Sequence, residues 1–287
     1  GPVGGSLINP EFVARLGIAA GRWSGSRGVA LIGRDTRRSG QALELALAAG
    51  LRAAGLETLS LGILPTPAVA RAVRQRGAAL GGVVTASHNP ASDNGIKLFG
   101  PGGLKLSDAD ERAIEAALER SDDALSRNAA ALAFDGSALA EYRQAAASLL
   151  PADSLRGWRI VVDAAHGAAH ASTPEVLSSL GAEVVALGTA PDGENINADQ
   201  GSEHPQHMAA RVIGSGAHLG LAHDGDGDRL VVADESGSVL DGDEVLAVLA
   251  LHALRVNRLA GRLLVVTVQS NLGLDAAVTA AGGRVLR

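Results

Sequence analysis

A pattern of strand, loop, helix and strand recurs three times along this chain. The opening strands are the apolar runs at residues 29–32, 159–163 and 263–267. Each copy closes on a second strand that starts at or just after a glycine, namely Gly55, Gly181 or Gly283. Apolar strands without polar alternation are typical of sheets covered by helices on both faces. The repeat predicts an α/β chain of related three-layer units in tandem, each on a mixed, mostly parallel sheet. Chance similarity among α/β units is the alternative.

The breaks between periodic segments give the expected unit boundaries. Residues 151–154 are short and polar between two periodic segments, which indicates a linker. We expect a first unit over residues 1–150, a second over residues 151–256 and an incomplete third over residues 257–287. Only 2% of the 287 residues are aromatic, so the cores must consist of Ala, Val and Leu packing. This length suits about two domains, or parts of three.

Apolar periodicity and capping residues predict the individual elements. Helices are expected over residues 11–22, 39–54, 107–119 and 137–150, with a further helix ending near residue 75 and another running through residue 281. Ser39 and Ser107 are the expected N-caps of two of these helices. Strands are expected over residues 29–33, 57–61, 80–85, 96–99, 159–163, 181–185, 218–222, 230–233, 263–267 and 283–286.

The loop after the predicted strand at residues 80–85 carries a candidate nucleophile. Its sequence is Thr85-Ala-Ser-His-Asn-Pro90, followed by Asp93-Asn-Gly-Ile-Lys97. Ligands of open α/β sheets bind beyond the carboxyl ends of the strands, so Ser87 stands where a substrate would meet it. Polar side chains that can orient a phosphate or move a proton follow in the same loop: His88, Asn89 and Lys97. The alternative is an ordinary capped turn, since Ser and Asn-Pro are common turn residues.

Three carboxylates alternate with glycines in the segment His223-Asp-Gly-Asp-Gly-Asp-Arg229, between two predicted strands. Glycine lets the backbone turn sharply so that the carboxylates can face one point, where they would repel one another without a cation. Hard oxygen ligands of this kind select Mg²⁺ or Ca²⁺. An EF-hand spacing also runs through to Glu235, but Arg229 stands where that loop needs glycine, and strands rather than helices flank it. A solvated acidic turn is the remaining alternative.

The two loops combine into one hypothesis. Three protein ligands leave open positions on Mg²⁺, which water or a phosphate oxygen usually fills, and a phosphate on Ser87 would complete the shell. The sequence contains no Gly-x-x-x-x-Gly-Lys-Ser/Thr loop, which argues against an ATP-fed kinase of the P-loop type. We therefore predict a phosphoserine that is neutralised by Mg²⁺ and donates its phosphoryl group.

Three segments together resemble the signature loops of the α-D-phosphohexomutases, in the order of that family. They are the Ser87 loop just described, Gly33-Arg-Asp-Thr-Arg37 and Asp224-Gly-Asp-Gly-Asp-Arg229. Within the family, residues 191–197, 201–205 and 270–273 most resemble the glucosamine branch. The resemblance implies that glucosamine 6-phosphate and glucosamine 1-phosphate are interconverted through a bisphosphorylated sugar. The alternatives are a phosphomannomutase or phosphoglucomutase of the same family, or a metal- and sugar-phosphate-binding module without enzymatic activity.

The same resemblance implies roles for individual side chains. The implied catalytic residues are Ser87, Lys97, His88 and Arg34. The implied Mg²⁺ ligands are Ser87, through its phosphate, Asp224, Asp226 and Asp228. The cations implied to offset charge near the phosphoserine are Arg34, Arg37 and Arg229. Lys97 is the first candidate for proton transfer or charge stabilisation, and His88 is the second. For Arg37 and His88 a role in bracing a loop is the alternative.

Two loops of the family do not occur in this sequence: a sugar-reading Gly-Glu-x-Ser-Gly-His loop and a phosphate-binding Arg-x-Ser-Gly-Thr loop. The first residues also start at what resembles the last glycine of the family's Asp-Gly-Ile-Arg-Gly loop. We therefore expect this polypeptide alone to hold metal and phosphoserine but to turn over sugar phosphates poorly.

Composition narrows the expected partners and setting. The net charge of −6 and the lack of a long basic run argue against nucleic acid. No apolar run reaches the roughly 18 residues that a membrane span needs. The chain has no cysteine, which excludes disulfides and thiolate metal sites and favours the cytoplasm. We expect a hexose or hexosamine phosphate as substrate, with no nucleic-acid or membrane partner. The apolar amino-terminal helix is a candidate surface for a homodimer.

Overall fold

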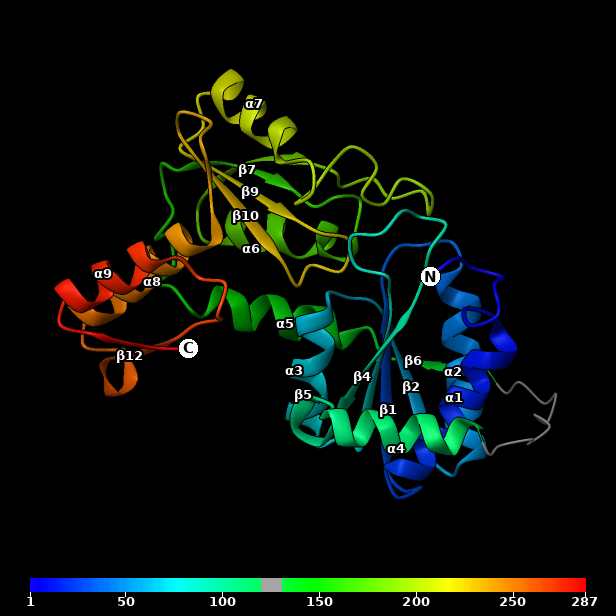
Figure 1. The fold of residues 1–287 in the computed structure, drawn as a ribbon. Helices are drawn as coiled ribbons and strands as arrows, with labels where there is room; N and C mark the ends of the chain where they lie inside the picture. Colours follow the sequence, from blue (N-terminus) through cyan, green and yellow to red (C-terminus); the bar gives the residue numbers. More distant parts are fainter. Residues whose placement is uncertain (120–130) are drawn as a thin grey trace.

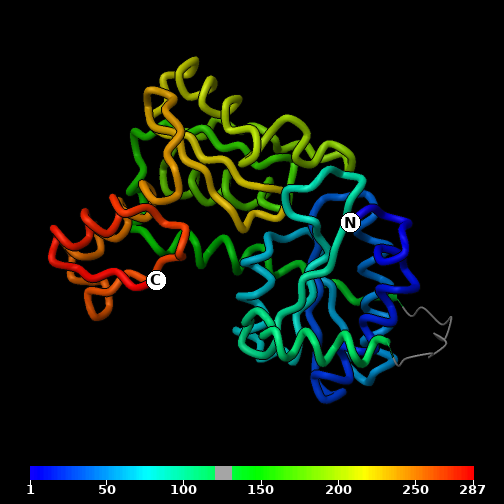
Figure 2. The backbone as a smooth tube through the Cα atoms, viewed as in Figure 1, coloured from blue at the N-terminus to red at the C-terminus, as the bar shows by residue number. Residues whose placement is uncertain are grey.

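The computed structural model of the chain describes residues 1–119 and 131–287. These residues form three successive α/β units, each built on its own sheet (Figures 1 and 2). The predicted fold class is confirmed, because helices pack on both faces of the mixed sheets in the two larger units. The unit boundaries expected at residues 150 and 256 stay predictions.

The first sheet has the strand order β5-β4-β3-β1-β2-β6. Along the chain its strands are β1 (Val29–Arg34), β2 (Glu57–Ile63), β3 (Leu80–Val84), β4 (Ile96–Gly100), β5 (Leu104–Lys105) and β6 (Ala133–Phe134). The central strand β1 runs parallel to β2 and β3, whereas β4 is antiparallel to both β3 and β5. The parallel strands β1 and β3 are almost wholly buried, as their continuous apolar sequences predict.

Five helices cover the two faces of this sheet: α1 (Pro10–Trp23), α2 (Gly40–Ala53), α3 (Thr66–Arg76), α4 (Asp108–Glu119) and α5 (Ser137–Ala147). Alternation along β1 separates the two cores. Ile32 packs with residues of α1, α2 and α4, whereas Leu31 packs with residues of α3 and α5. The backbones of α1 and α2 nearly touch, because a Cβ on Gly50 would lie 1.9 Å from the carbonyl oxygen of Ala14.

The second sheet has the order β11-β10-β9-β7-β8. Its strands are β7 (Arg159–Asp163), β8 (Glu183–Leu187), β9 (Leu219–His223), β10 (Leu230–Asp234) and β11 (Val239–Leu240). The helices α6 (Thr173–Ser179) and α7 (Pro205–Ser215) cover its opposite faces. Strand β7 is parallel to β8 and β9, and β10 is antiparallel to both of its neighbours, β9 and β11. The second sheet therefore has the same strand order and directions as the first sheet without β6.

This shared arrangement gives the two conspicuous loops equivalent places. The Ser87 loop connects β3 to the antiparallel strand β4, and the carboxylate loop connects β9 to the antiparallel strand β10. Both loops therefore leave a parallel strand at its carboxyl end, the edge at which α/β sheets bind ligands. In Figure 1 these edges of the two sheets face each other.

The third unit is a two-stranded parallel sheet of β12 (Leu263–Val265) and β13 (Arg284–Leu286) with two helices. These are α8 (Gly242–Arg255) and α9 (Leu272–Ala280), whose apolar residues form one small cluster with the strands. Asp241 and Glu244 form a capping box at the start of α8. Short 3₁₀ turns complete the described fold at Pro101–Gly103, Ala168–Ala171 and Ala260–Arg262.

Two predictions about local structure need correction, and two of the described helices have no predicted counterpart. Ser39 occupies the N-cap position of α2 but its hydroxyl does not cap the helix; it accepts from the Asn94 amide instead, at 2.9 Å. The helix expected over residues 137–150 ends at Ala147. Helices α7 and α8 were not predicted. Ser107, in contrast, accepts from the backbone N–H of Asp110 and caps α4 as expected.

The apolar face of α1, named as a candidate homodimer surface, is used inside the first unit. Its buried residues pack against α2 and α4. This face is therefore not available to a second copy of the chain. Among residues 1–119 and 131–287, no helix combines the length and the apolar character that crossing a bilayer requires.

Candidate active site

Ser87 lies just past the end of β3 in a backbone conformation that is uncommon for a residue with a side chain. Its φ is 52°, in the left-handed region. The backbone N–H of Ser87 donates to the hydroxyl of Thr85 at 2.9 Å, and that hydroxyl donates to Asp35 at 2.7 Å. Such conformations persist only where the surrounding structure holds them, so the hydrogen bonds around this loop maintain the backbone of Ser87.

The carboxylate loop brings its three acidic side chains together. One oxygen from each of Asp224, Asp226 and Asp228 lies within 4.8 Å of the others. Asp224 and Asp226 are fully buried, whereas Asp228 is exposed. The hydroxyl of Ser87 donates to Asp224 Oδ2 at 2.5 Å across a separation of 137 residues. The two loops that the sequence singled out therefore meet in one site, and strands flank the acidic loop as predicted.

The acidic cluster has the donor set of a divalent-cation site. Asp226 Oδ1 is buried and has no hydrogen-bond partner, although Asp226 Oδ2 accepts from Thr66 and Lys97. A buried carboxylate oxygen without a partner is costly, and a hard cation would satisfy it. Oxygen-only ligands of this kind suit Mg²⁺. The residues of this loop thus fit the predicted metal.

Lys97 joins the cluster from strand β4. Its Nζ donates to Asp226 Oδ2 and to Asp228 Oδ2, each at 2.7 Å. Partial burial acts to lower the pKa of Lys97, but the bonds to the two carboxylates outweigh it and raise the pKa above its usual value. Arg229 lies at the rim, where its Nε is 3.9 Å from Asp224 Oδ2 and its Nη1 pairs with Glu203 at 3.1 Å.

The sequence predicts that Arg37 offsets charge near a phosphate on Ser87, but its guanidinium is occupied elsewhere. Its side chain is fully buried, and Nε pairs with Asp35 Oδ2 at 2.9 Å. The two Nη atoms donate to four backbone carbonyls of the serine loop, those of Ser87, Asn89, Pro90 and Asp93. All five guanidinium N–H groups are thus used within the first unit. This geometry is that of the alternative role named for Arg37, in which its side chain braces a loop, here the serine loop.

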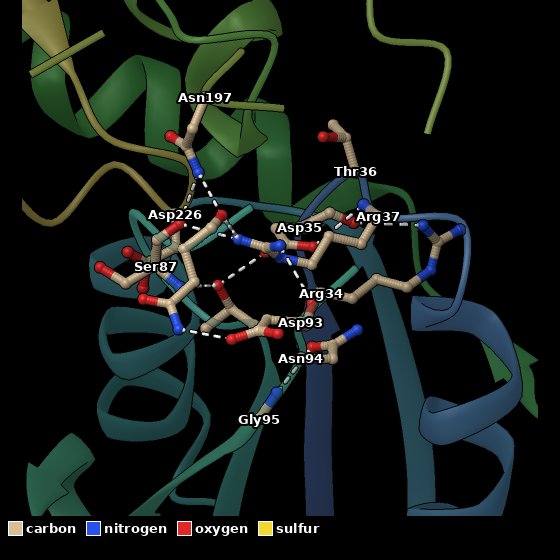
Figure 3. A network of polar contacts seen from close by, with 12 residues as sticks. Arg34, Asp35, Thr36, Arg37, Ser87, Asp93, Asn94, Gly95, Asn197 and Asp226 are labelled. Atoms are coloured by element: carbon tan, nitrogen blue, oxygen red, sulfur yellow. Dashed lines mark hydrogen bonds and ion pairs between the residues drawn. The ribbon is translucent and has the colours of Figure 1, made fainter. Parts of the chain in front are cut away.

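Arg34 is also directed away from the site. Figure 3 shows its guanidinium pointing away from Ser87, and its Nε pairs with Glu44 of α2 at 3.1 Å. Neither its predicted place among the catalytic residues nor its predicted contact with the phosphoserine agrees with this position. Side chains alternate along β1, so Arg34 lies on the same face of the sheet as Ile32, which is the face that α2 covers. Burial raises the pKa of Glu44, while its bonds to Ser60 and Arg34 act in the opposite direction.

His88 follows Ser87 in the loop and is half-buried. Its Nδ1 is buried and has no hydrogen-bond partner. The structure therefore assigns it no bracing bond at that atom, and its predicted role as second candidate for proton transfer stays a prediction.

The residues that sequence reasoning missed are those that hold the serine loop. Asp35 accepts from Thr85 and Arg37, and burial raises its pKa above the ordinary value, although both partners oppose this. Asn197, from the second unit, donates to the carbonyls of Ser87 and Asn89 (Figure 3). A carboxylate at the end of a buried strand was a usable signal for Asp35. Residues 191–197 resemble the glucosamine branch, but nothing in them indicates that Asn197 contacts the serine loop, because its partners lie more than 100 residues away.

Comparison with known proteins agrees with this arrangement. Residues 1–125 match the family model described as phosphoglucomutase/phosphomannomutase alpha/beta/alpha domain I, and residues 140–237 match domain II of the same family. Phosphoglucosamine mutases from Aeromonas hydrophila and Halorhodospira halophila are 47% and 45% identical to the chain, over 98% of its length. The chain spans 64% and 63% of these two relatives.

A solved structure shows the same fold. The phosphoglucomutase/phosphomannomutase family protein from Burkholderia thailandensis superposes with a TM-score of 0.85 at 27% sequence identity. The match covers 100% of this chain and 63% of that protein. Two family models, relatives at almost half identity and a shared fold all point to the same family. The chain belongs to the α-D-phosphohexomutase family, the phosphoglucomutase/phosphomannomutase family of these comparisons.

Proposed function

We propose that the protein containing this chain interconverts glucosamine 6-phosphate and glucosamine 1-phosphate, with Ser87 carrying the phosphoryl group. One observation carries the proposal: the Ser87 hydroxyl donates at 2.5 Å to Asp224, which belongs to a cluster of three carboxylates. A serine that only capped a turn would not need a contact with an acidic cluster of another unit. The relatives named as phosphoglucosamine mutases support the choice of sugar.

The transfer itself uses a bound sugar phosphate and a phosphorylated Ser87. The phosphorus–oxygen bond to Ser87 Oγ breaks, and a bond from phosphorus to a sugar hydroxyl oxygen forms, which gives a bisphosphorylated sugar and a free serine. The sugar hydroxyl gives its proton to His88, the candidate acceptor, and His88 passes a proton to Ser87 Oγ as that oxygen leaves phosphorus. After the sugar turns round, its other phosphoryl group returns to Ser87 Oγ, whose hydroxyl proton passes by way of His88 to the sugar oxygen that is released. The phosphoserine is thereby restored.

The charges around Ser87 suit this transfer. When bound, Mg²⁺ would be held by Asp224, Asp226 and Asp228 and would offset the charge of the phosphoryl group. The Lys97 ammonium donates to two of these carboxylates, so it is placed to stabilise developing negative charge rather than to accept a proton. Arg229 adds a second cation at the rim.

Replacing Ser87 by alanine in the full-length protein tests the proposal. We expect Ser87→Ala to lose mutase turnover and the phosphate found on the Ser87 peptide by mass spectrometry. Ser92→Ala is the matched control, because Ser92 is an exposed serine of the same loop. Near-normal turnover by Ser87→Ala would reject Ser87 as the carrier.

The choice of sugar and the metal site need separate measurements. Rates of the full-length protein on glucosamine, glucose and mannose phosphates decide between the branches of the family, and preference for glucose or mannose would overturn the glucosamine assignment. Replacing Asp224, Asp226 or Asp228 by asparagine should weaken Mg²⁺ binding in calorimetry, since each supplies one charged ligand. Wild-type protein that binds Mg²⁺ but never carries phosphate on Ser87 would favour a binding module.

A further inference from the structure

Two backbone carbonyls of the serine loop receive hydrogen bonds from both units at once. Arg37 of the first unit donates to the carbonyl oxygens of Ser87 and Asn89 at 3.0 and 2.7 Å. Asn197 of the second unit donates its Nδ2 to the same two oxygens at 2.9 and 3.1 Å (Figure 3). A carbonyl oxygen has two lone pairs, so this pair of residues uses the full accepting capacity of both carbonyls.

Asn197 is itself held firmly where it can do this. Its residue is 91% buried, its φ is +60°, and its backbone N–H donates to the carbonyl of Ala165 at 2.9 Å. Asparagine tolerates this left-handed conformation better than most residues with a side chain. The loop that carries Asn197 has a second bond to the first unit at an earlier residue, where the backbone N–H of Arg38 donates to the carbonyl of Gly193 at 2.9 Å.

The acidic loop packs against the same atoms. A Cβ on Gly225 would lie 2.6 Å from the Ser87 carbonyl oxygen and 2.8 Å from Asn197 Nδ2. Gly225 stands between Asp224 and Asp226 in the chain, so the backbone of the acidic loop packs against the Ser87 carbonyl and the Asn197 amide. The serine loop, the Asn197 loop and the acidic loop therefore share one contact point.

We propose that Asn197 is a positioning residue that fixes the direction of the Ser87 side chain toward the acidic loop. Ser87 is held at a φ of 52°, and bonds that fix its carbonyl also fix the backbone from which its Cβ projects. The bonds from Arg37 hold the loop to its own unit, whereas those from Asn197 tie the same carbonyls to the unit that carries the carboxylates. This inference rests on the proposed function for its kinetic consequence, but not for its structural one.

Two substitutions separate the side-chain amide from the backbone. Asn197→Asp keeps the shape and the tolerance of positive φ but replaces the donor by an acceptor that faces two carbonyls. Asn197→Gly keeps the backbone conformation and removes the side chain. Asn257→Asp is the matched control, since Asn257 also has a positive φ, of 53°, but is exposed at the end of α8.

Amide hydrogen exchange of the serine loop is the first readout, measured on the full-length protein. We expect exchange over residues 86–93 to be about tenfold faster in both Asn197 variants, because two hydrogen bonds to the loop are lost. Exchange in the helices of both units should be unchanged, which excludes general unfolding. Asn257→Asp should leave the serine loop as it is in the wild type.

The kinetic readout is the change in kcat against the change in KM. We expect kcat of both Asn197 variants to fall on the order of 10- to 100-fold, because small displacements of a reacting group have effects of this size, while KM stays close to that of the wild type. Unchanged exchange of the serine loop, or unchanged kcat, in both variants overturns the positioning role. If the wild type has no mutase activity, the proposed function fails, and the exchange measurement alone decides whether Asn197 positions the loop.

Discussion

Replacing Arg37 by methionine should cost the protein much of its stability. The substitution keeps an unbranched apolar stem but leaves Asp35, which is fully buried, without its cation. Breaking a buried ion pair from one side costs about 3–5 kcal/mol, because the remaining charge stays desolvated. The carbonyls of Pro90 and Asp93 also lose their bonds from Arg37, which adds to the cost. A domain of ordinary stability, about 5–15 kcal/mol, would lose a large part of it.

Urea unfolding at equilibrium measures this loss, and the next residue supplies the control. Arg38 has an exposed side chain that pairs with exposed Glu194, so Arg38→Met should change the free energy of unfolding by no more than about 1 kcal/mol. Adding Asp35→Asn to Arg37→Met should recover part of the loss, because the unpaired charge is then gone. If Arg37→Met costs no more than Arg38→Met, the reasoning from burial and donor count is wrong.

Three further changes have expected outcomes that differ in kind. Burial raises the pKa of Glu44 in the folded state, so its contribution to stability is present below pH 4.5 and lost as pH rises through the folded pKa; the advantage of wild type over Glu44→Gln in urea unfolding should shrink as pH rises above 4.5, and a growing advantage would refute this. Gly50→Ala should lower the free energy of unfolding by at least the roughly 1–3 kcal/mol of an overpacked core, and with it the melting temperature, because its Cβ would lie 1.9 Å from Ala14 O; an unchanged melting temperature would contradict the close helix contact. Lys97→Gln should tighten Mg²⁺ binding in calorimetry while lowering turnover, because the ammonium competes for carboxylates such as Asp226; weaker binding would argue against that competition.

The chemistry of the site could be predicted from the sequence because it depends on residue type and on strand ends. Ser87 and the carboxylates each follow an apolar strand, and parallel strands place such positions at one edge of a sheet. The same reasoning could not tell which way Arg34 and Arg37 point. Arg34 ends β1 and Arg37 lies in the loop that follows, but the guanidinium of Arg34 pairs with α2, whereas that of Arg37 donates to the serine loop.

Helices and contacts between units were harder to predict. Helix α7 begins at Pro205, a favoured first helical residue, yet its apolar positions are few and were not recognised. Asn197 contacts a loop 110 residues away, and nothing in its local sequence indicates such a partner. A single polar side chain such as Asn197, which stabilises a loop through long-range hydrogen bonds, belongs to no periodic pattern, and the packed structure is needed to identify it.

The distance along the chain between Ser87 and Asp224 has a consequence for synthesis. Ser87 leaves the ribosome 137 residues before Asp224 does, which at about 5–20 residues per second is a delay on the order of ten seconds. The last helix of the first unit ends at Ala147, which leaves about 4–15 seconds for this unit to fold before Asp224 emerges, and its core needs no residue of the second unit. Newly made chains therefore present the serine loop for seconds before the carboxylates and the Asn197 amide exist to complete its surroundings, so a nascent chain cannot acquire the assembled site until the second unit has emerged and docked.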